Sequence, residues 1–395
     1  MCKNRPPPAD PLTTATPCHT GIRTLSNSYI GSAGATPFSD QGSSGWGDQG
    51  PVICHLMSSV GLGVTMQYAN LGNTGLNVSR FCLGTMTFGL QTDEENAQAI
   101  LNVADEAGVN FLDTADVYPL GGDLGTVGRT EEILGRWLQG KRQRFVVASK
   151  CVGRTGNSAW DRGASRKHIL QAIDASLTRL GTDYVDLYQL HSDDPSTPFD
   201  ETIDALDTVV QSGKARYIGV SNFLAYRLAR ALGRADLRRR TRFVSVQPRY
   251  SLLFREIERE LLPLALEEGL GVIPYNPLAG GFLSGKHRFG GDPTPGTRFT
   301  LGNAGPRYQQ RYWNEQAFAK VEALRGAVAD SGLPLIGAAI AWVLANPAIT
   351  APIIGASRPE QLADTLPAVD LRLDDAIKQK LDALTVEFRR GDSAR

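Results

Sequence analysis

The stretch Phe111-Leu112-Asp113-Thr114-Ala115-Asp116-Val117-Tyr118 decides the fold. It begins inside a short apolar run, residues 109–112, that predicts a buried strand, and Asp113 stands where this run stops. Tyr118 follows five residues later. In parallel α/β folds, the active site forms from polar groups at the carboxyl ends of the strands. Asp and Tyr are also ordinary loop residues, so the prediction depends on whether this pattern recurs.

A short apolar strand followed by a helical segment does recur through the chain. Strands are expected at residues 81–84, 109–112, 145–149, 184–188, 216–220, 243–247, 271–275 and 351–354. A first helix is expected to begin after a cap at Thr92. Further helices are expected at residues 130–139, 166–180, 200–212, 223–233 and 256–268, and as two pieces within 314–346. Two more are expected to begin at about residues 359 and 373. Before the first strand, residues 68–71 and 78–80 predict a hairpin.

Eight apolar strands that alternate with helices predict an α/β protein, a (β/α)8 TIM barrel with a short N-terminal hairpin. An open, doubly wound sheet is the alternative. That alternative is weakened because no G-x-G-x-x-G fingerprint follows any expected strand.

Polar or small residues follow every expected strand, and a barrel would bring them to one mouth. A single strand-end lysine or histidine is usually a surface or turn residue. Polar or small residues recur at the ends of eight successive strands, however, so that explanation is improbable for the set as a whole. In chain order these residues are Gly84, Thr85 and Met86; Asp113; Lys150; His191; Ser221 and Asn222; Gln247; Tyr275, Asn276 and Pro277; and Gly355, Ser357 and Arg358.

Four of these candidate residues form a set with a clear chemical use. A tyrosine hydroxyl has a pKa of about 10, and a neighbouring ammonium group, held in place by a carboxylate, is expected to lower it. Such a tyrosine can donate a proton to an oxygen that gains negative charge, and a neutral imidazole can hydrogen-bond the same oxygen. Asp113, Tyr118, Lys150 and His191 therefore predict carbonyl reduction, with hydride from a cofactor because no side chain supplies it.

Composition excludes several other classes of function. The chain has 395 residues with 41 Lys+Arg and 41 Asp+Glu, so it shows no net attraction to nucleic acid or to anionic membranes. The densest basic run, residues 234–242, is interpreted as a solvated helix end. No apolar stretch approaches the ~20 residues that span a bilayer. Five cysteines without a pairing pattern indicate a reducing compartment, so a cytoplasmic location is predicted.

Residues 1–65 differ from the remainder of the chain. They are rich in Pro, Gly, Ser and Thr without helical or strand periodicity, which predicts a disordered extension before a single barrel domain at residues 66–395. They lack the features of a secretory signal. The dipeptides Cys18-His19 and Cys54-His55 do not have the spacing of a structural zinc site, so no metal is expected.

Several motifs together resemble the aldo-keto reductase superfamily over roughly residues 66–388: LGTMTFG (83–89), FLDTADVY (111–118), VVASK (146–150), IGVSNF (218–223) and PIIGASRPEQL (352–362). The resemblance implies an NADPH-dependent enzyme that reduces aldehydes or ketones. It places the proton donor at Tyr118, with Lys150 and Asp113 lowering its pKa and His191 orienting the substrate.

The resemblance also implies a set of cofactor contacts. Ser221, Asn222 and Gln247 would hold the nicotinamide carboxamide, and Tyr275 would stack on its ring. Ser357 and Arg358 precede a helix and suit a 2′-phosphate, which favours NADP(H) over NAD(H). The remaining expected contacts are Gly84, Thr85, Met86, Asp113, Asn276, Pro277, Leu278, Gly280, Lys286, Arg298, Gly355 and Gln361, with Lys286 and Arg298 near the pyrophosphate or adenosine phosphate.

The loop at residues 278–286 contains a competing motif. Gly280 to Lys286 fits the phosphate-loop pattern G-x-x-x-x-G-K, but His287 stands where Ser or Thr would bind Mg²⁺. A glycine-rich loop over a dinucleotide pyrophosphate explains these residues better. The same loop resembles the branch that includes potassium-channel β subunits. An NADPH-binding regulatory subunit with slow turnover is therefore the alternative function, and a homo-oligomer is possible.

Overall fold

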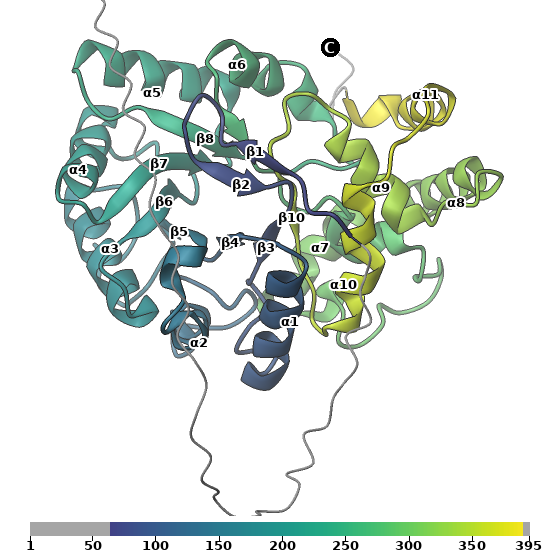
Figure 1. The fold of residues 1–395 in the computed structure, drawn as a ribbon, viewed down its shortest axis with the longest axis horizontal. Helices are drawn as coiled ribbons and strands as arrows, with labels where there is room; N and C mark the ends of the chain where they lie inside the picture. Colours follow the sequence, from purple (N-terminus) through teal and green to yellow (C-terminus); the bar gives the residue numbers. More distant parts are fainter. Residues whose placement is uncertain (1–63, 390–395) are drawn as a thin grey trace, which may run out of the picture. The chain divides into compact units, whose positions relative to one another are not determined.

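The computed structural model describes residues 64–389, and these form an eight-stranded parallel barrel surrounded by helices (Figure 1). A two-stranded antiparallel hairpin, β1 (Tyr68–Asn70) and β2 (Asn77–Ser79), precedes the barrel. The barrel strands are β3 (Cys82–Gly84), β4 (Phe111–Asp113), β5 (Val146–Cys151), β6 (Val185–Leu190), β7 (Ala215–Ser221), β8 (Phe243–Gln247), β9 (Gly271–Val272) and β10 (Ile353–Ile354).

Helices follow the strands as the sequence pattern predicts. They are α1 (Glu94–Glu106), α2 (Arg129–Leu138), α3 (Arg166–Leu180), α4 (Phe199–Gln211), α5 (Ala225–Leu237), α6 (Leu261–Glu267), α7 (Gly305–Tyr312), α8 (Glu315–Ala329), α9 (Leu335–Leu344), α10 (Glu360–Thr365) and α11 (Asp375–Leu384). Short 3-10 helices lie at Arg142–Arg144, Glu256–Glu258, Ala279–Ser284, Arg298–Thr300, Gly302–Ala304, Leu366–Val369 and Val386–Arg389.

The strands pair in the order β10-β3-β4-β5-β6-β7-β8-β9, and all of these pairs are parallel. The chain before β10 closes the ring against β9. Ile349 forms a parallel bridge with Val272, and Ile353 N donates to Pro274 O at 2.8 Å. These contacts close the parallel sheet, so it has no open edge, whereas a doubly wound sheet would have two. The predicted (β/α)8 barrel is therefore confirmed.

Two apolar cores determine where polar groups can stand. The larger core lies between the strands and the helices. The smaller one lies within the barrel, where Cys82, Phe111, Ala148 and Leu187 meet Leu71 and Val78 of the hairpin. Because side chains alternate along a strand, the residues two positions further on share the inward face. These residues are Gly84, Asp113, Lys150 and Gln189, which form a polar layer above an apolar plug.

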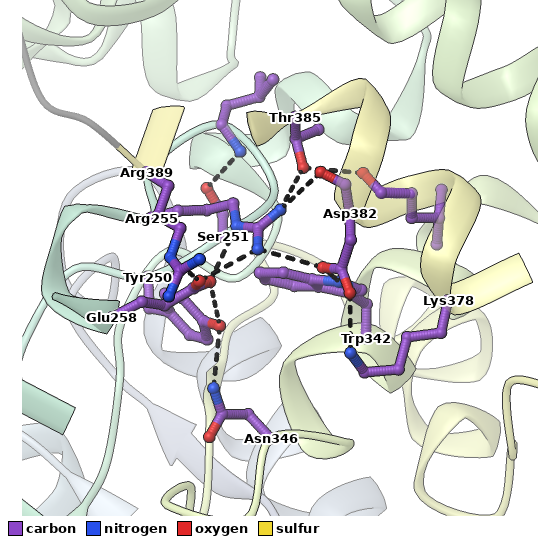
Figure 2. Close-up of polar contacts among 12 residues, drawn as sticks. Tyr250, Ser251, Arg255, Glu258, Trp342, Asn346, Lys378, Asp382, Thr385 and Arg389 are labelled. Carbon is purple, nitrogen blue, oxygen red and sulfur yellow. Dashed lines mark hydrogen bonds and ion pairs between the residues drawn. The ribbon is translucent and has the colours of Figure 1, made fainter. Parts of the chain in front are cut away.

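A buried polar cluster fastens the C-terminal segment to the loop after β8 (Figure 2). Its centre is Arg255, which is only 6% exposed. The Arg255 guanidinium donates to both carboxylate oxygens of Glu258, to Thr385 Oγ1 at 2.9 Å and to Asp382 O at 3.0 Å. Tyr250 OH donates to Glu258 Oε1 at 2.8 Å. We call this set the C-terminal clasp; its carboxylates balance a cation that would be costly to bury alone.

Some local predictions were wrong. The first barrel helix is capped by Asp93, whose side chain accepts from Asn96 N, while Thr92 Oγ1 donates to Thr87 Oγ1 at 3.1 Å. The helix α7 was not expected; it lies between the helices predicted at 256–268 and 314–346. The basic run 234–242 is confirmed as a helix end, and its arginines pair with nearby carboxylates. These pairs join Arg234 to Asp200, Arg238 and Arg240 to Asp204, and Arg242 to Asp236 and Glu268.

Candidate active site

A buried ion pair lies at the centre of the barrel mouth. Asp113 ends β4 and Lys150 lies near the end of β5, and their side chains are 4% and 0% exposed. Lys150 Nζ donates to Asp113 Oδ2 at 2.6 Å and to Thr114 O at 2.8 Å. Burial alone would lower the pKa of Lys150, but Asp113 and Tyr118 outweigh it and leave the pKa above its usual value. Lys150 is therefore a fixed cation at neutral pH.

Tyr118 lies beside this cation, as predicted. Lys150 Nζ donates to Tyr118 OH at 3.5 Å, and Tyr118 is 7% exposed. The expected net lowering of its pKa is wrong: burial raises the pKa of Tyr118 to about 12, Lys150 offsets only part of that rise, and Asp113 adds to the rise instead of lowering the pKa. Burial has the larger effect because the charged phenolate would have to form away from water, inside the protein. The hydroxyl therefore keeps its proton at neutral pH and can act as an acid.

His191 completes the predicted set from the loop after β6. Its ring meets Tyr118 edge-on, with centroids 5.6 Å apart and an interplanar angle of 79°. Burial and the Lys150 ammonium lower the pKa of His191 to about 3. The imidazole is therefore neutral at physiological pH. This agrees with the expected role, in which a neutral ring N–H donates a hydrogen bond to a substrate oxygen.

Two glutamine side chains bind the other oxygen of Asp113. Gln247 Nε2 donates to Asp113 Oδ1 at 2.8 Å, and Gln189 Nε2 donates to the same atom at 3.3 Å. Gln247 Nε2 is also 3.4 Å from Gln189 Oε1. Sequence reasoning missed Gln189 because it considered strand ends, whereas Gln189 lies within β6. Its signal was the alternation that places Gln189 on the inward face next to Lys150.

A second chain of hydrogen bonds connects His191 with the aromatic side chain after β9. Asn222 Nδ2 donates to His191 O at 2.9 Å and to Ser221 Oγ at 3.0 Å. Tyr275 OH donates to Asn222 Oδ1 at 2.8 Å. Ser221 Oγ donates to Gln247 O at 2.8 Å. The residues expected at the nicotinamide carboxamide are therefore mutually connected, beside the ion pair.

A cavity of about 640 Å³ runs from this mouth across the strand ends of β9, β10 and β3. Most of the predicted cofactor residues line it, namely Gly84, Met86, Tyr275, Asn276, Pro277, Leu278, Gly280, Lys286, Arg298, Gly355, Ser357, Arg358 and Gln361. Thr85, Asp113, Ser221, Asn222 and Gln247 are not in its lining; Thr85 lies directly behind the ion pair, because Thr85 Oγ1 donates to Asp113 O at 2.9 Å.

The cavity wall also includes residues outside the expected set of cofactor contacts. Gln91 lines it, and Gln91 Nε2 donates to Gly296 O, so the loop after β3 meets the segment at 294–298 across the cavity. Asp364 and Thr365 of α10 line the end near Arg358. A contact between two loops more than 200 residues apart in sequence leaves no local sequence signal.

The glycine-rich loop does not have the geometry of a nucleotide-triphosphatase phosphate loop. It folds as a kinked 3-10 segment, Ala279–Ser284, with left-handed φ angles of 71° at Gly280 and 91° at Gly281. A Cβ on Gly280 would lie 2.7 Å from the ring of Tyr308. His287 lies in an aromatic cluster, with centroids 4.9 Å from Phe299 and 5.1 Å from Trp313. Lys286 and His287 therefore face different surroundings, the cavity and the core.

Comparison with known proteins identifies the family. Residues 80–385 match the Aldo/keto reductase family. The chain belongs to this family. It is 42% identical to the uncharacterized oxidoreductase YrpG of Bacillus subtilis, over 80% of this chain and 95% of that protein. It is 38% identical to a probable voltage-gated potassium channel subunit beta of Arabidopsis thaliana, over 78% and 92%. It is 34% identical to protein tas of Escherichia coli, over 81% and 97%.

Membership makes this protein an oxidoreductase, and the family as a whole acts on carbonyl compounds and uses nicotinamide dinucleotides. Within residues 64–389, no helix is long and apolar enough to cross a membrane, and no group of three or more His, Cys, Asp or Glu side chains is arranged to hold a metal ion. The expectations for residues 1–63, including disorder and the Cys-His dipeptides, lie outside the described part of the chain.

Proposed function

We propose that this protein is an NADPH-dependent enzyme that reduces an aldehyde or ketone to an alcohol. The observation that carries the proposal is the contact of Lys150 Nζ with both Asp113 Oδ2 and Tyr118 OH, beside a cavity with three cations. A nicotinamide cofactor supplies the hydride when bound. The protein's own residues then have to orient the carbonyl and provide one proton.

Tyr118 is assigned as the proton donor. Its hydroxyl is protonated at neutral pH, because the pKa is about 12 in the buried site. Once Tyr118 gives its proton to the developing alkoxide, the phenolate is stabilised by the Lys150 ammonium, whose charge is held by Asp113. His191 is assigned as the neutral donor that holds the carbonyl oxygen towards Tyr118. Tyr118 and His191 can stabilise the negative charge that develops on the carbonyl oxygen, and this stabilisation is stronger in the transition state than in the ground state.

The cavity residues fit a dinucleotide phosphate. Lys286, Arg298 and Arg358 line it, and Arg298 Nη1 is buried without a hydrogen-bond partner in the described chain. Burial and the charge of Arg358 lower the pKa of Lys286, so these two cations act on each other across the cavity. Three cations are suited to a pyrophosphate plus a third phosphate. This supports NADP(H) over NAD(H), with Arg358 at the 2′-phosphate.

A second candidate is a regulatory subunit that binds NADPH and turns over slowly. It is favoured by the similarity to a probable potassium channel subunit beta at 38% identity. The retained ion pair and tyrosine favour the enzyme. The deciding experiment follows NADPH absorbance with a simple aromatic aldehyde: sustained multiple turnovers support the enzyme, and a single turnover with retained NADP+ supports the subunit.

The boundaries 1–65 and 66–395, a cytoplasmic location and homo-oligomerisation remain predictions.

A further inference from the structure

Three arginines near Tyr275 are not explained by the cofactor cavity. Arg249 follows β8, and Arg307 and Arg311 belong to α7. None of them is among the residues that line the cavity, whose cations are Lys286, Arg298 and Arg358. We call Arg249, Arg307 and Arg311 the mouth arginines.

Arg249 is directed by the strand that carries Gln247. The chain stays extended beyond β8, where Arg249 forms a parallel bridge with Tyr275 and Tyr275 N donates to Pro248 O at 2.9 Å. Side chains alternate along extended chain, and the next residue, Tyr250, packs on the outside against Trp342. Arg249 therefore lies on the same side as Gln247, towards the mouth. Its guanidinium stacks on Phe254 at 3.5 Å, which fixes its orientation.

Arg307 and Arg311 come from α7. They are four residues apart and so share a face of α7. The Arg311 guanidinium lies 5.9 Å from the ring of Tyr308. Burial raises the pKa of Tyr275, and the positive charges of Arg249, Arg311 and Arg307 each offset part of this rise.

The α7 helix also connects these charges with the proton donor. Asn276 Nδ2, directly after Tyr275, donates to Tyr308 OH at 3.5 Å, and Tyr308 contributes to raising the pKa of both Tyr118 and Tyr275. Just before α7, Asn303 Nδ2 donates to Gly122 O at 2.7 Å, which joins this segment to the loop after Tyr118. Arg249 therefore adjoins Tyr275, and α7 adjoins Asn276 and the loop after Tyr118.

In the part of the chain that the structure describes, no carboxylate pairs with these arginines. Within residues 64–389, the mouth arginines form no ion pair, whereas four arginines of the 234–242 run do. Two acids of the loop after β6 have other partners: Asp193 pairs with Arg227, and Asp194 accepts from Ser196 and Thr197. Uncompensated positive charge around a concave site attracts anions.

We propose that the substrates of this reductase carry an anionic group, a carboxylate or a phosphate, and that Arg249 and Arg311 bind this group while the carbonyl lies at Tyr118. The exposed Arg307 adds attraction at longer range. This inference rests on the proposed reductase function and names the class of substrate for the same site. An arginine guanidinium is suited to both anions because its N–H groups match their oxygens in pairs.

The test uses the full chain with NADPH and three aldehydes of one scaffold: 4-formylbenzoate, 4-formylphenyl phosphate and the neutral methyl 4-formylbenzoate. We expect kcat/KM to be higher for at least one anion than for the ester. In Arg249→Gln and Arg311→Gln, the anion-to-ester ratio should fall by about ten- to a hundredfold, the range for loss of a charge-assisted hydrogen bond. Arg230→Gln, on the exposed side of α5, removes the same charge elsewhere and should leave the ratio unchanged.

The outcomes separate this inference from the proposed function. If none of the three aldehydes is reduced, the reductase function fails. If the ester is reduced as fast as both anions, or if neither mouth variant changes the ratio, only the anionic substrate class is overturned. A fall restricted to one anion identifies that anion as the ligand group. Raised NaCl with the unmodified protein gives a check that needs no variant, because salt should reduce the anion-to-ester ratio; a constant ratio would contradict the inference.

Discussion

Replacing Tyr118 with phenylalanine tests the assignment of the proton donor. The change deletes one hydroxyl and keeps a ring that is 7% exposed. The lost contact is the 3.5 Å hydrogen bond from Lys150 Nζ, which lies at the long limit for such bonds. A net loss of stability near the lower end of 0.5–1.5 kcal/mol is expected. The rate of reduction should fall by about two to four orders of magnitude, the usual contribution of a positioned general acid.

The assay is single-turnover loss of NADPH absorbance with an aromatic aldehyde, together with NADPH binding by fluorescence. Binding should be unchanged, since Tyr118 does not line the cofactor cavity. Tyr188→Phe is the matched control, because it deletes another buried tyrosine hydroxyl from the outer core, on the other face of β6. If Tyr118→Phe reduced the aldehyde at close to the parent rate, the proton would have to come from His191 or water, and the assignment would be refuted.

Three other changes test the cofactor site, the domain boundary and a buried histidine. Arg358→Ala should weaken NADPH binding by about tenfold, the lower end for a charge-assisted contact because Arg358 is exposed, with NADH binding nearly unchanged; equal weakening would place Arg358 elsewhere on the cofactor. A protein that starts at Met66 should keep its melting temperature and rate, and a clear loss in either would show that residues 1–65 contribute to the fold. Burial lowers the pKa of His287 to about 4, so below pH ~6.5 the unfolded chain takes up a proton that the folded one resists and stability falls towards pH 4; His287→Phe should lose less melting temperature between pH 7 and 5 than the parent, and an equal loss would argue against this role of His287.

The barrel and the four-residue set could be predicted because each is repeated or local in the sequence. Apolar strands alternate with helices, and Asp113, Lys150 and His191 follow their strands. The sign of the Tyr118 pKa shift could not be predicted, because it depends on how completely the folded mouth excludes water. Burial raises this pKa and the Lys150 charge lowers it, and only the structure shows that burial has the larger effect.

Other features were missed because their cause lies far away in the sequence. α7 has a polar composition that resembles a loop, and its buried residues Tyr308 and Tyr312 contact Phe299 and Phe282, which are distant from the barrel strands in sequence pattern. The bond from Gln91 to Gly296 joins two loops without a shared pattern. The cap at Asp93 instead of Thr92 reflects competition, since Thr92 is held by Thr87 and the backbone of Ser357.

The C-terminal clasp has a consequence for how the chain matures on the ribosome. Arg255 reaches its partners Asp382 O and Thr385 Oγ1 only after about 130 further residues have been synthesised, and Cys82 of β3 waits even longer for Ile353 of β10. Until then the nascent sheet has two unpaired edges, which invite wrong pairing. Because such distant contacts form slowly, the ring closes only once β10 has emerged. Arg255, whose charge Glu258 already balances, gains its hydrogen bonds to Asp382 O and Thr385 later still.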